Sequence, residues 1–369
     1  MKKIVCMAAA VVLCFVLPLE TFAYMPSVMG NEVETLAGTG SHGAWDGGLS
    51  QFNQPMGITY HEGRILIADT FNNLLRFIDA DGEVGTFAGV LRETAPDNFP
   101  RGFYRDDVLL EAEFGRPIGL AFDSGGRIFV ADSQNSAIRV IWEDRVFTFS
   151  GGLGAGFADG SPPVAVFNRP GAVAVGRGGY LYVADTGNHL IRRISPDGYA
   201  TTIAGVPGQY GHEDGPAYAT LFDSPMGIAV SAEGVIFVAD TGNNLIRVIE
   251  DGVVRTLAGR VLLDEDEYDA FPMGGFSDGA GEDALFNMPM GLTIWNGYLI
   301  VADSVNHAIR AVSMEGEVVT LLGSGYPGYA MGIAESAMFH FPTGVFAHGN
   351  RLLIADTGNN KIRTVEISH

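Results

Sequence analysis

Hydrophobic residues in this chain gather in short runs and not in a helical period. Six of the runs end in Ala-Asp and are apolar at nearly every position before it: ILIAD, IFVAD, LYVAD, IFVAD, LIVAD and LLIAD. A short, continuous apolar run is typical of a strand that is buried on both faces. No window shows a sustained helical period, so the pattern predicts an all-β protein built from buried strands.

A longer unit surrounds each run and occurs six times. After the strand, every copy has Asp, then Asn three residues later and Arg seven residues later, as in Asp240, Asn243 and Arg247. An apolar strand ending in Gly and a Phe-x-x-Pro segment recur in fixed order between the copies. Each repeat therefore supplies four strands, and six four-stranded units arranged radially make a six-bladed β-propeller.

The order of these signatures also predicts how the ring closes. The first strand ending in Gly, ETLAG at 34–38, precedes every other signature, and the last repeat ends without such a strand. Residues 33–37 are therefore expected to form the outer strand of the sixth blade. This arrangement would join the two ends of the repeat array and leave no open edge between blades.

The Asp that ends each run is interpreted as a structural turn residue and not as part of a ring-shaped site. Its carboxylate is expected to accept a bond from the backbone N–H two residues on. The Arg suits a partly buried ion pair, and His189 and His307 are expected to be exposed turn residues. The six aspartates are Asp69, Asp132, Asp185, Asp240, Asp303 and Asp356.

The amino-terminal segment resembles a secretory leader. Lys2 and Lys3 precede an apolar run over 4–19, and small residues flank a cleavage site after Ala23. We expect a signal peptide over 1–23, a propeller over 24–369, and a product secreted to the extracellular space or cell envelope with no membrane span. A retained anchor is the alternative. Both cysteines lie in the leader, which excludes thiol chemistry from the mature protein.

The net charge of the chain limits the kinds of partner that it is expected to bind. The formal net charge is −21, and a strongly acidic surface repels phosphate backbones, which bind proteins through Lys and Arg. Nucleic acid is therefore not an expected partner.

Six long loops connect each outer strand to the next inner strand and lie on one face of the disc, together with the Asp turns. They span 39–51, 90–113, 152–166, 206–221, 260–285 and 324–338, and hold nineteen Asp or Glu against four Arg. Aromatic faces stack on sugars, and carboxylates bind hydroxyl or cationic groups. We expect this face to bind a protein, peptide or carbohydrate through Trp45, Tyr104, Phe157, Tyr210, Phe276 and Tyr326.

The central channel is a second candidate site, here for a metal ion. None of the inner strands contains His, Asp or Glu, but polar residues follow the Phe of each repeat near the channel mouth. Oxygen ligands there could hold a hard cation, and the candidates are Asp223, Asn168, Asn287 and His340. Asp-Gly pairs in the loops are interpreted as turns. Weak calcium binding by the acidic run at 264–269 is kept open; no other cofactor is expected.

The repeat order T-L-A-G, F-x-x-P-x-G and A-D-T-G-N-x-x-I-R is similar to that of the NHL repeat family over about residues 30–367. The resemblance implies a six-bladed propeller and, because family members are mostly binding modules, favours a binding scaffold over an enzyme. Some members bind RNA through a basic face, which this acidic face does not match. The alternative is a metal-assisted hydrolase or lyase at the channel mouth, as in relatives that cleave lactones or peptidyl-hydroxyglycine. No catalytic residue is assigned.

Overall fold

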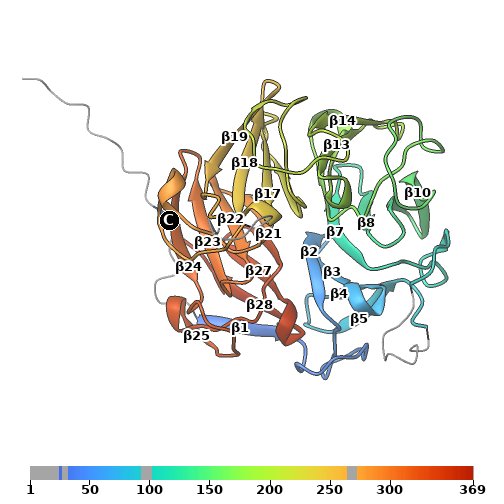
Figure 1. Ribbon diagram of the computed structural model, residues 1–369. Helices are drawn as coiled ribbons and strands as arrows, with labels where there is room; N and C mark the ends of the chain where they lie inside the picture. Colours follow the sequence, from blue (N-terminus) through green and yellow to red (C-terminus); the bar gives the residue numbers. More distant parts are fainter. Residues whose placement is uncertain (1–24, 27–31, 93–101, 264–271, 369) are drawn as a thin grey trace, which may run out of the picture.

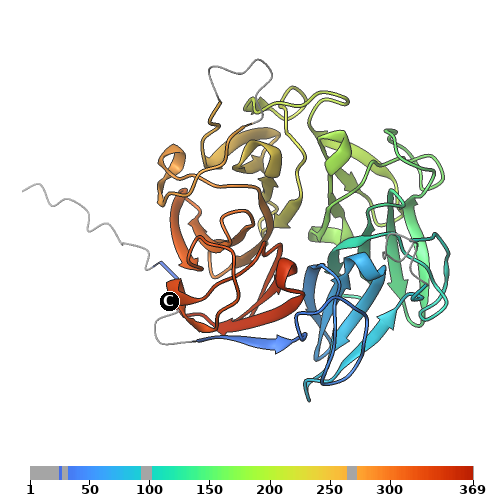
Figure 2. The same cartoon turned by 60° about the horizontal axis from the view of Figure 1, so that its bottom comes forward.

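The computed structural model describes residues 25–26, 32–92, 102–263 and 272–368. These residues form six antiparallel sheets arranged as blades around a central channel (Figures 1 and 2). The predicted six-bladed propeller is confirmed. The leader at 1–23 and the acidic run at 264–269 lie outside the described residues.

Each sheet runs from an inner strand beside the channel to an outer strand at the rim, in chain order in blades one to five. Blade one consists of β2 (Pro55–His61), β3 (Arg64–Asp69), β4 (Leu74–Ile78) and β5 (Val84–Ala88). Blade two consists of β7 (Pro117–Phe122), β8 (Ile128–Asp132), β9 (Ala137–Trp142) and β10 (Arg145–Gly151). Blade three consists of β11 (Ala172–Val175), β12 (Leu181–Asp185), β13 (Leu190–Ile194) and β14 (Ala200–Ala204).

The other three blades follow the same plan. Blade four consists of β16 (Gly227–Val230), β17 (Ile236–Asp240), β18 (Leu245–Glu250) and β19 (Val253–Ala258). Blade five consists of β21 (Pro289–Trp295), β22 (Tyr298–Asp303), β23 (Ala308–Ser313) and β24 (Glu317–Leu322). Blade six consists of β26 (Gly344–His348), β27 (Arg351–Asp356), β28 (Lys361–Glu366) and β1 (Glu32–Ala37).

Four of the blades carry a two-residue fifth strand that the four-strand repeat did not predict. The long loop before the blade folds back along the blade's outer edge and pairs with the outer strand. These strands are β6 (Asp107–Val108), β15 (Gly215–Pro216), β20 (Gly279–Ala280) and β25 (Gly332–Ile333). The loops therefore cover exposed sheet edges before they reach the channel, which limits edge-to-edge pairing with other chains.

Short 3-10 helices occur at the turns. In blades one, three, four and six, the turn after the strand-ending Asp is η1 (Thr70–Asn72), η3 (Thr186–Asn188), η4 (Thr241–Asn243) and η7 (Thr357–Asn359). Three others are η2 (Arg177–Gly179), η5 (Gly281–Asp283) and η6 (Ala334–Ser336).

The predicted closure of the ring is confirmed. Strand β1 pairs antiparallel with β28, with Glu34 opposite Thr364 and Thr35 opposite Arg363. In Figure 2 the blue arrow of β1 lies along the red strands of the last blade. The amino-terminal strand therefore supplies the outer strand that the last repeat lacks.

The hydrophobic core consists of clusters between neighbouring blades, which explains the continuous apolar runs. In β17, Ile236 and Val238 pack against blade three, whereas Phe237 and Ala239 pack against blade five. Because successive side chains of a strand point to opposite faces, a strand covered on both sides must be apolar at every position. No helix in the described part of the chain is long and apolar enough to span a membrane.

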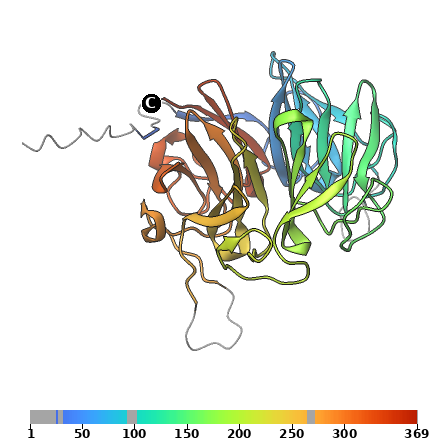
Figure 3. The ribbon, with the colours of Figure 1, turned by 90° about the horizontal axis from the view of Figure 1, so that it is seen from above.

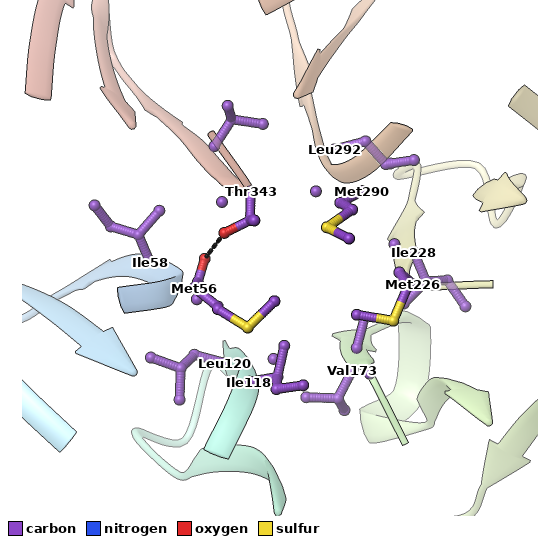
Figure 4. Close-up of a pocket in the computed structure, with 18 residues that line it drawn as sticks. Met56, Ile58, Ile118, Leu120, Val173, Met226, Ile228, Met290, Leu292 and Thr343 are labelled. Carbon is purple, nitrogen blue, oxygen red and sulfur yellow. Dashed lines mark hydrogen bonds between the residues drawn. The ribbon is translucent and has the colours of Figure 1, made fainter. Parts of the chain in front are cut away.

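The channel is narrow and lined by the inner strands (Figure 4). A Cβ on Gly57 would lie 1.8 Å from the backbone oxygen of Ile118 in the next blade, so only glycine allows this approach. Met56, Met226 and Met290 lie around the channel at the same position of three blades (Figure 4). The walls are thus mostly apolar, with Thr343 as a polar side chain among them (Figure 4). Figure 3 shows the same blades turned by 90° from the view of Figure 1.

Candidate functional site

The Asp, Asn and Arg of each repeat form a buried cluster that we call the clasp. In blade four, Asp240 Oδ2 accepts from Asn243 Nδ2 and from Arg247 Nη1, both at 2.8 Å. The Asp and Arg side chains of all six clasps have no exposed surface. The clasp therefore joins the second and third strands of its blade and is closed to ligands.

The prediction that the Asp carboxylate accepts a hydrogen bond from a backbone N–H of its own turn is wrong. In the turns that form 3-10 helices, the Asp caps no backbone N–H of the turn. The second carboxylate oxygen of Asp240 instead accepts from the backbone N–H of Asp223, at 2.8 Å, at the entrance to the inner strand. The equivalent bond occurs in every blade. The turn itself is made by a left-handed residue such as Asn244, with φ 58°.

The clasps of blades one, four and five are ion pairs at neutral pH. Burial raises the pKa of Asp69, Asp240 and Asp303 to about 6, against the lowering effect of their hydrogen bonds and of the neighbouring Arg. A carboxyl with that pKa is ionised at pH 7. Removing either partner would leave a buried, uncompensated charge, which is the costly way to break such a pair.

A second carboxylate completes the clasp in five blades, and it was missed in the sequence. Asp214 Oδ1 accepts from Arg247 Nη2 at 2.6 Å, and its other oxygen accepts from the backbone N–H of Thr256 at 2.8 Å. The equivalent contacts to Arg Nη2 come from Asp46, Asp106, Asp159 and Asp278. Four of these five aspartates belong to the Asp-Gly pairs, for which the sequence predicts only turns.

A signal for this second carboxylate was present in the sequence. In blades two to five the aspartate stands eight residues before the Phe of the Phe-x-x-Pro segment, as Asp214 does before Phe222. The following Gly215 has φ 133°, which favours glycine. In blade six, Met331 occupies this position before Phe339, and among the residues that the structure describes Asp356 is the one carboxylate paired with Arg363.

The six predicted ligand-binding aromatics fall into two groups. Tyr104, Phe157 and Phe276 lie over clasp guanidinium groups, with ring centroids 4.9 to 5.0 Å from the Arg carbon. The Phe of Phe-x-x-Pro lies near the same guanidinium, with its ring centroid 4.8 to 5.2 Å from the Arg carbon. The structure therefore places these three as covers over the clasps, although each remains partly exposed.

Trp45, Tyr210 and Tyr326 form the second group and project into solvent. Their exposed fractions are 71%, 68% and 72%. Tyr210 lies beside the junction of blades three and four, with its ring centroid 5.7 Å from that of His189. These side chains come from different loops and make no shared cluster, so they present separate contact points around one face.

His189 and His307 are not exposed turn residues as expected, because both are half-buried and join neighbouring blades. His189 Nδ1 accepts from the backbone N–H of Ser224 at 3.0 Å, and His307 Nδ1 accepts from that of Phe341 at 3.0 Å. Asn or Ser makes the same blade-to-blade bond elsewhere in the ring. Burial is the main cause that lowers the pKa of His307, and the neighbouring His340 lowers it further.

The four candidate metal ligands lie on four successive blades, and each contacts its own turn. Asn168 Nδ2 donates to the Gly187 oxygen, and the ring of His340 packs beside Gly358. His189, whose Nδ1 lies 3.3 Å from Asp223 Oδ1, and the hydrogen bond from the Ser224 hydroxyl lower the pKa of Asp223. In the described ranges no group of three or more His, Cys, Asp or Glu could hold a metal ion. The metal site at Asp223, Asn168, Asn287 and His340 stays a prediction.

Comparisons with known proteins agree with this architecture. The model of the NHL repeat matches residues 114–141, 167–194 and 222–249. The chain is 29% identical over 280 residues to Protein SUPPRESSOR OF QUENCHING 1, chloroplastic, of Arabidopsis thaliana, covering 72% of this chain and 26% of that protein. It is 27% identical over 347 residues to NHL repeat-containing protein 2 of Bos taurus, covering 84% and 46%. The chain thus spans less than half of these relatives.

A solved structure shows the same fold at low sequence identity. An auxiliary nutrient binding protein from Bacteroides thetaiotaomicron superposes with a TM-score of 0.67 and 14% identity, over 95% of this chain and 79% of that one.

Proposed function

Because the chain belongs to the NHL repeat family and its repeats close one six-bladed propeller, we propose that it is a binding module whose loop face docks a partner. The partner is a protein, peptide or carbohydrate of the cell envelope or extracellular space. The nutrient-binding propeller from Bacteroides thetaiotaomicron shares the fold alone.

One observation carries the proposal: exposed aromatic side chains stand on the loops that differ most between blades. Trp45, Tyr210 and Tyr326 each expose about 70% of their surface and cover no clasp guanidinium. Large aromatic residues dominate the energetics of binding surfaces because they bury much area at little entropic cost. Exposed rings spaced around one face therefore suit a partner that spans several blades.

The proposed location rests on the leader. Lys2, Lys3, the apolar run at 4–19 and the small residues before Ala23 support export of the chain. Export would place the loop face in contact with envelope material, and the net charge of −21 would favour neutral or cationic partners there.

The experiment is capture from envelope material with the mature protein, followed by affinity measurements on the isolated partner. Trp45→Ala, Tyr210→Ala and Tyr326→Ala should each weaken binding by about tenfold, as for interface aromatics. Trp142→Ala and Tyr180→Ala are matched controls on the opposite face, with exposed fractions of 42% and 37%. Equal affinities in both sets would contradict the proposal.

The response of the protein to calcium distinguishes this binding role from metal-assisted chemistry at the channel mouth. A hydrolase or lyase that used Asp223, Asn168, Asn287 and His340 would bind a divalent cation, and the melting temperature would then rise with calcium. A binding module needs no such shift. Metal analysis of the purified protein, followed by a calcium titration of the melting temperature, distinguishes the two roles.

A further inference from the structure

A pocket of about 360 Å³ opens on the loop face at the channel mouth, where blades one, two and three meet. Its walls include the side chains of Arg116, Arg169, Phe71 and Gln134, and its floor is formed by Met56 and Ile118. It thus combines two cationic groups, an aromatic ring and an amide with an apolar floor. No such combination was predicted from the sequence.

The two arginines occupy the same position in successive blades, directly before the Pro of the inner strand. The other four blades have Gln54, Ser224, Met288 and Phe341 there, so the charge is confined to one side of the mouth. Among the residues that the structure describes, no carboxylate lies within ion-pair distance of Arg116 or Arg169, in contrast to the clasp arginines. Both side chains are exposed to solvent.

The backbone conformation fixes the positions from which both arginine side chains project. Arg116 and Arg169 have φ of 50° and 49°, and their backbone N–H groups donate to Asn73 Oδ1 and Ser136 Oγ of the preceding blade. The guanidinium carbon of Arg116 lies 4.6 Å from the ring centroid of Phe71. Stacking holds a guanidinium flat and leaves its N–H edge free for an oxyanion.

We propose that this pocket binds a small organic carboxylate with an apolar body, and the proposal rests on the binding role above. Planar guanidinium groups match the two oxygens of a carboxylate, while Met56 and Ile118 accept the apolar part. A chain with a net charge of −21 repels a polyanion more than a monoanion. The chemistry therefore favours a monocarboxylate over a phosphate.

Calorimetric titration with 2-naphthoate tests the proposal, with 2-naphthamide as the uncharged match and inorganic phosphate as the competing anion. We expect saturable binding of naphthoate alone. Arg116→Gln and Arg169→Gln should each weaken it by about tenfold or more, because each loses a charge-assisted bond. Arg255→Gln, an exposed arginine of the outer strand of blade four, has the same change in charge and should leave binding unchanged.

Three results would overturn the assignment: no saturable binding of naphthoate up to about 10 mM, equal affinity for naphthamide, or equal loss in Arg255→Gln. Tighter binding of phosphate would overturn the choice of carboxylate. The titration also separates this proposal from the broader one. Trp45→Ala and Tyr326→Ala should lower the affinity for the captured partner and leave the affinity for naphthoate unchanged. Either proposal can therefore fail while the other stands.

Discussion

The clasps and the loops share one face of the propeller but differ in what they repeat. Each clasp buries its Asp and Arg completely, and Arg Nη1 donates to Asp Oδ2 in every blade. The loops beside them expose different side chains in each blade, such as Trp45 in one and Tyr326 in another. Residues that recur in all six blades hold the fold, and residues that occur once are free to recognise a partner.

The largest expected effect follows from breaking one clasp. Arg310→Met would leave Asp303 buried and unpaired, and we expect the free energy of unfolding to fall by about 3–5 kcal/mol. Urea denaturation followed by circular dichroism measures the loss. Where that variant does not fold, Arg310→Lys keeps the charge, loses the two-pronged geometry and should cost less. A loss below about 1 kcal/mol for Arg310→Met would contradict a structural role.

A smaller effect is expected from the second carboxylate. Asp214→Ala removes contacts to Arg247 and Thr256 at a site whose carboxylate is 46% exposed. We expect a loss of about 1–2 kcal/mol by the same denaturation, because a bond to a charged group is lost where water can replace part of it. Tyr218→Ala in the same loop is the control. Equal free energies of unfolding for Asp214→Ala and Tyr218→Ala would contradict a stabilising role of the second carboxylate.

Blade six offers the reverse experiment. Its clasp has Met331 where other blades have Asp, and Arg363 Nη2 donates to the backbone oxygen of Ala330, at 3.0 Å, without a second carboxylate among the described residues. Met331→Asp would supply the missing carboxylate and should raise the free energy of unfolding by up to about 1 kcal/mol, the usual range for a solvent-exposed pair. A destabilised variant would show that the equivalence of Met331 and Asp214 is wrong.

The smallest effect appears only at acidic pH. Because the pKa of His307 is lowered in the folded state, the unfolded chain binds more protons below the ordinary value of 6.5, and stability falls as pH decreases through that range. His307→Asn supplies the acceptor that Asn73 and Asn244 provide elsewhere. The melting temperature of the wild type should therefore fall below that of the variant as pH decreases. Parallel curves would contradict this account.

The fold was predictable because its determinants are local and recur. Apolar runs such as residues 236–240 imply strands covered on both sides, and the position of ETLAG implied the closure that β1 makes. The site was harder because its contacts join segments far apart in the chain. Asp214 meets Arg247 across 33 residues, and Arg116 and Arg169 share a pocket across two blades. The spacing to Phe222 marks Asp214, but no local pattern names Arg247 as its partner or brings Arg116 and Arg169 to one pocket.

One paired measurement tests the division between clasp and loop most directly. Tyr210 and Asp214 stand in one loop, four residues apart, with the first exposed and the second bound to its clasp. Tyr210→Ala should lower the affinity for the captured partner by about tenfold and leave the free energy of unfolding unchanged. Asp214→Ala should lower that free energy and leave the affinity of the folded protein unchanged. Loss of affinity in Asp214→Ala alone would contradict the account.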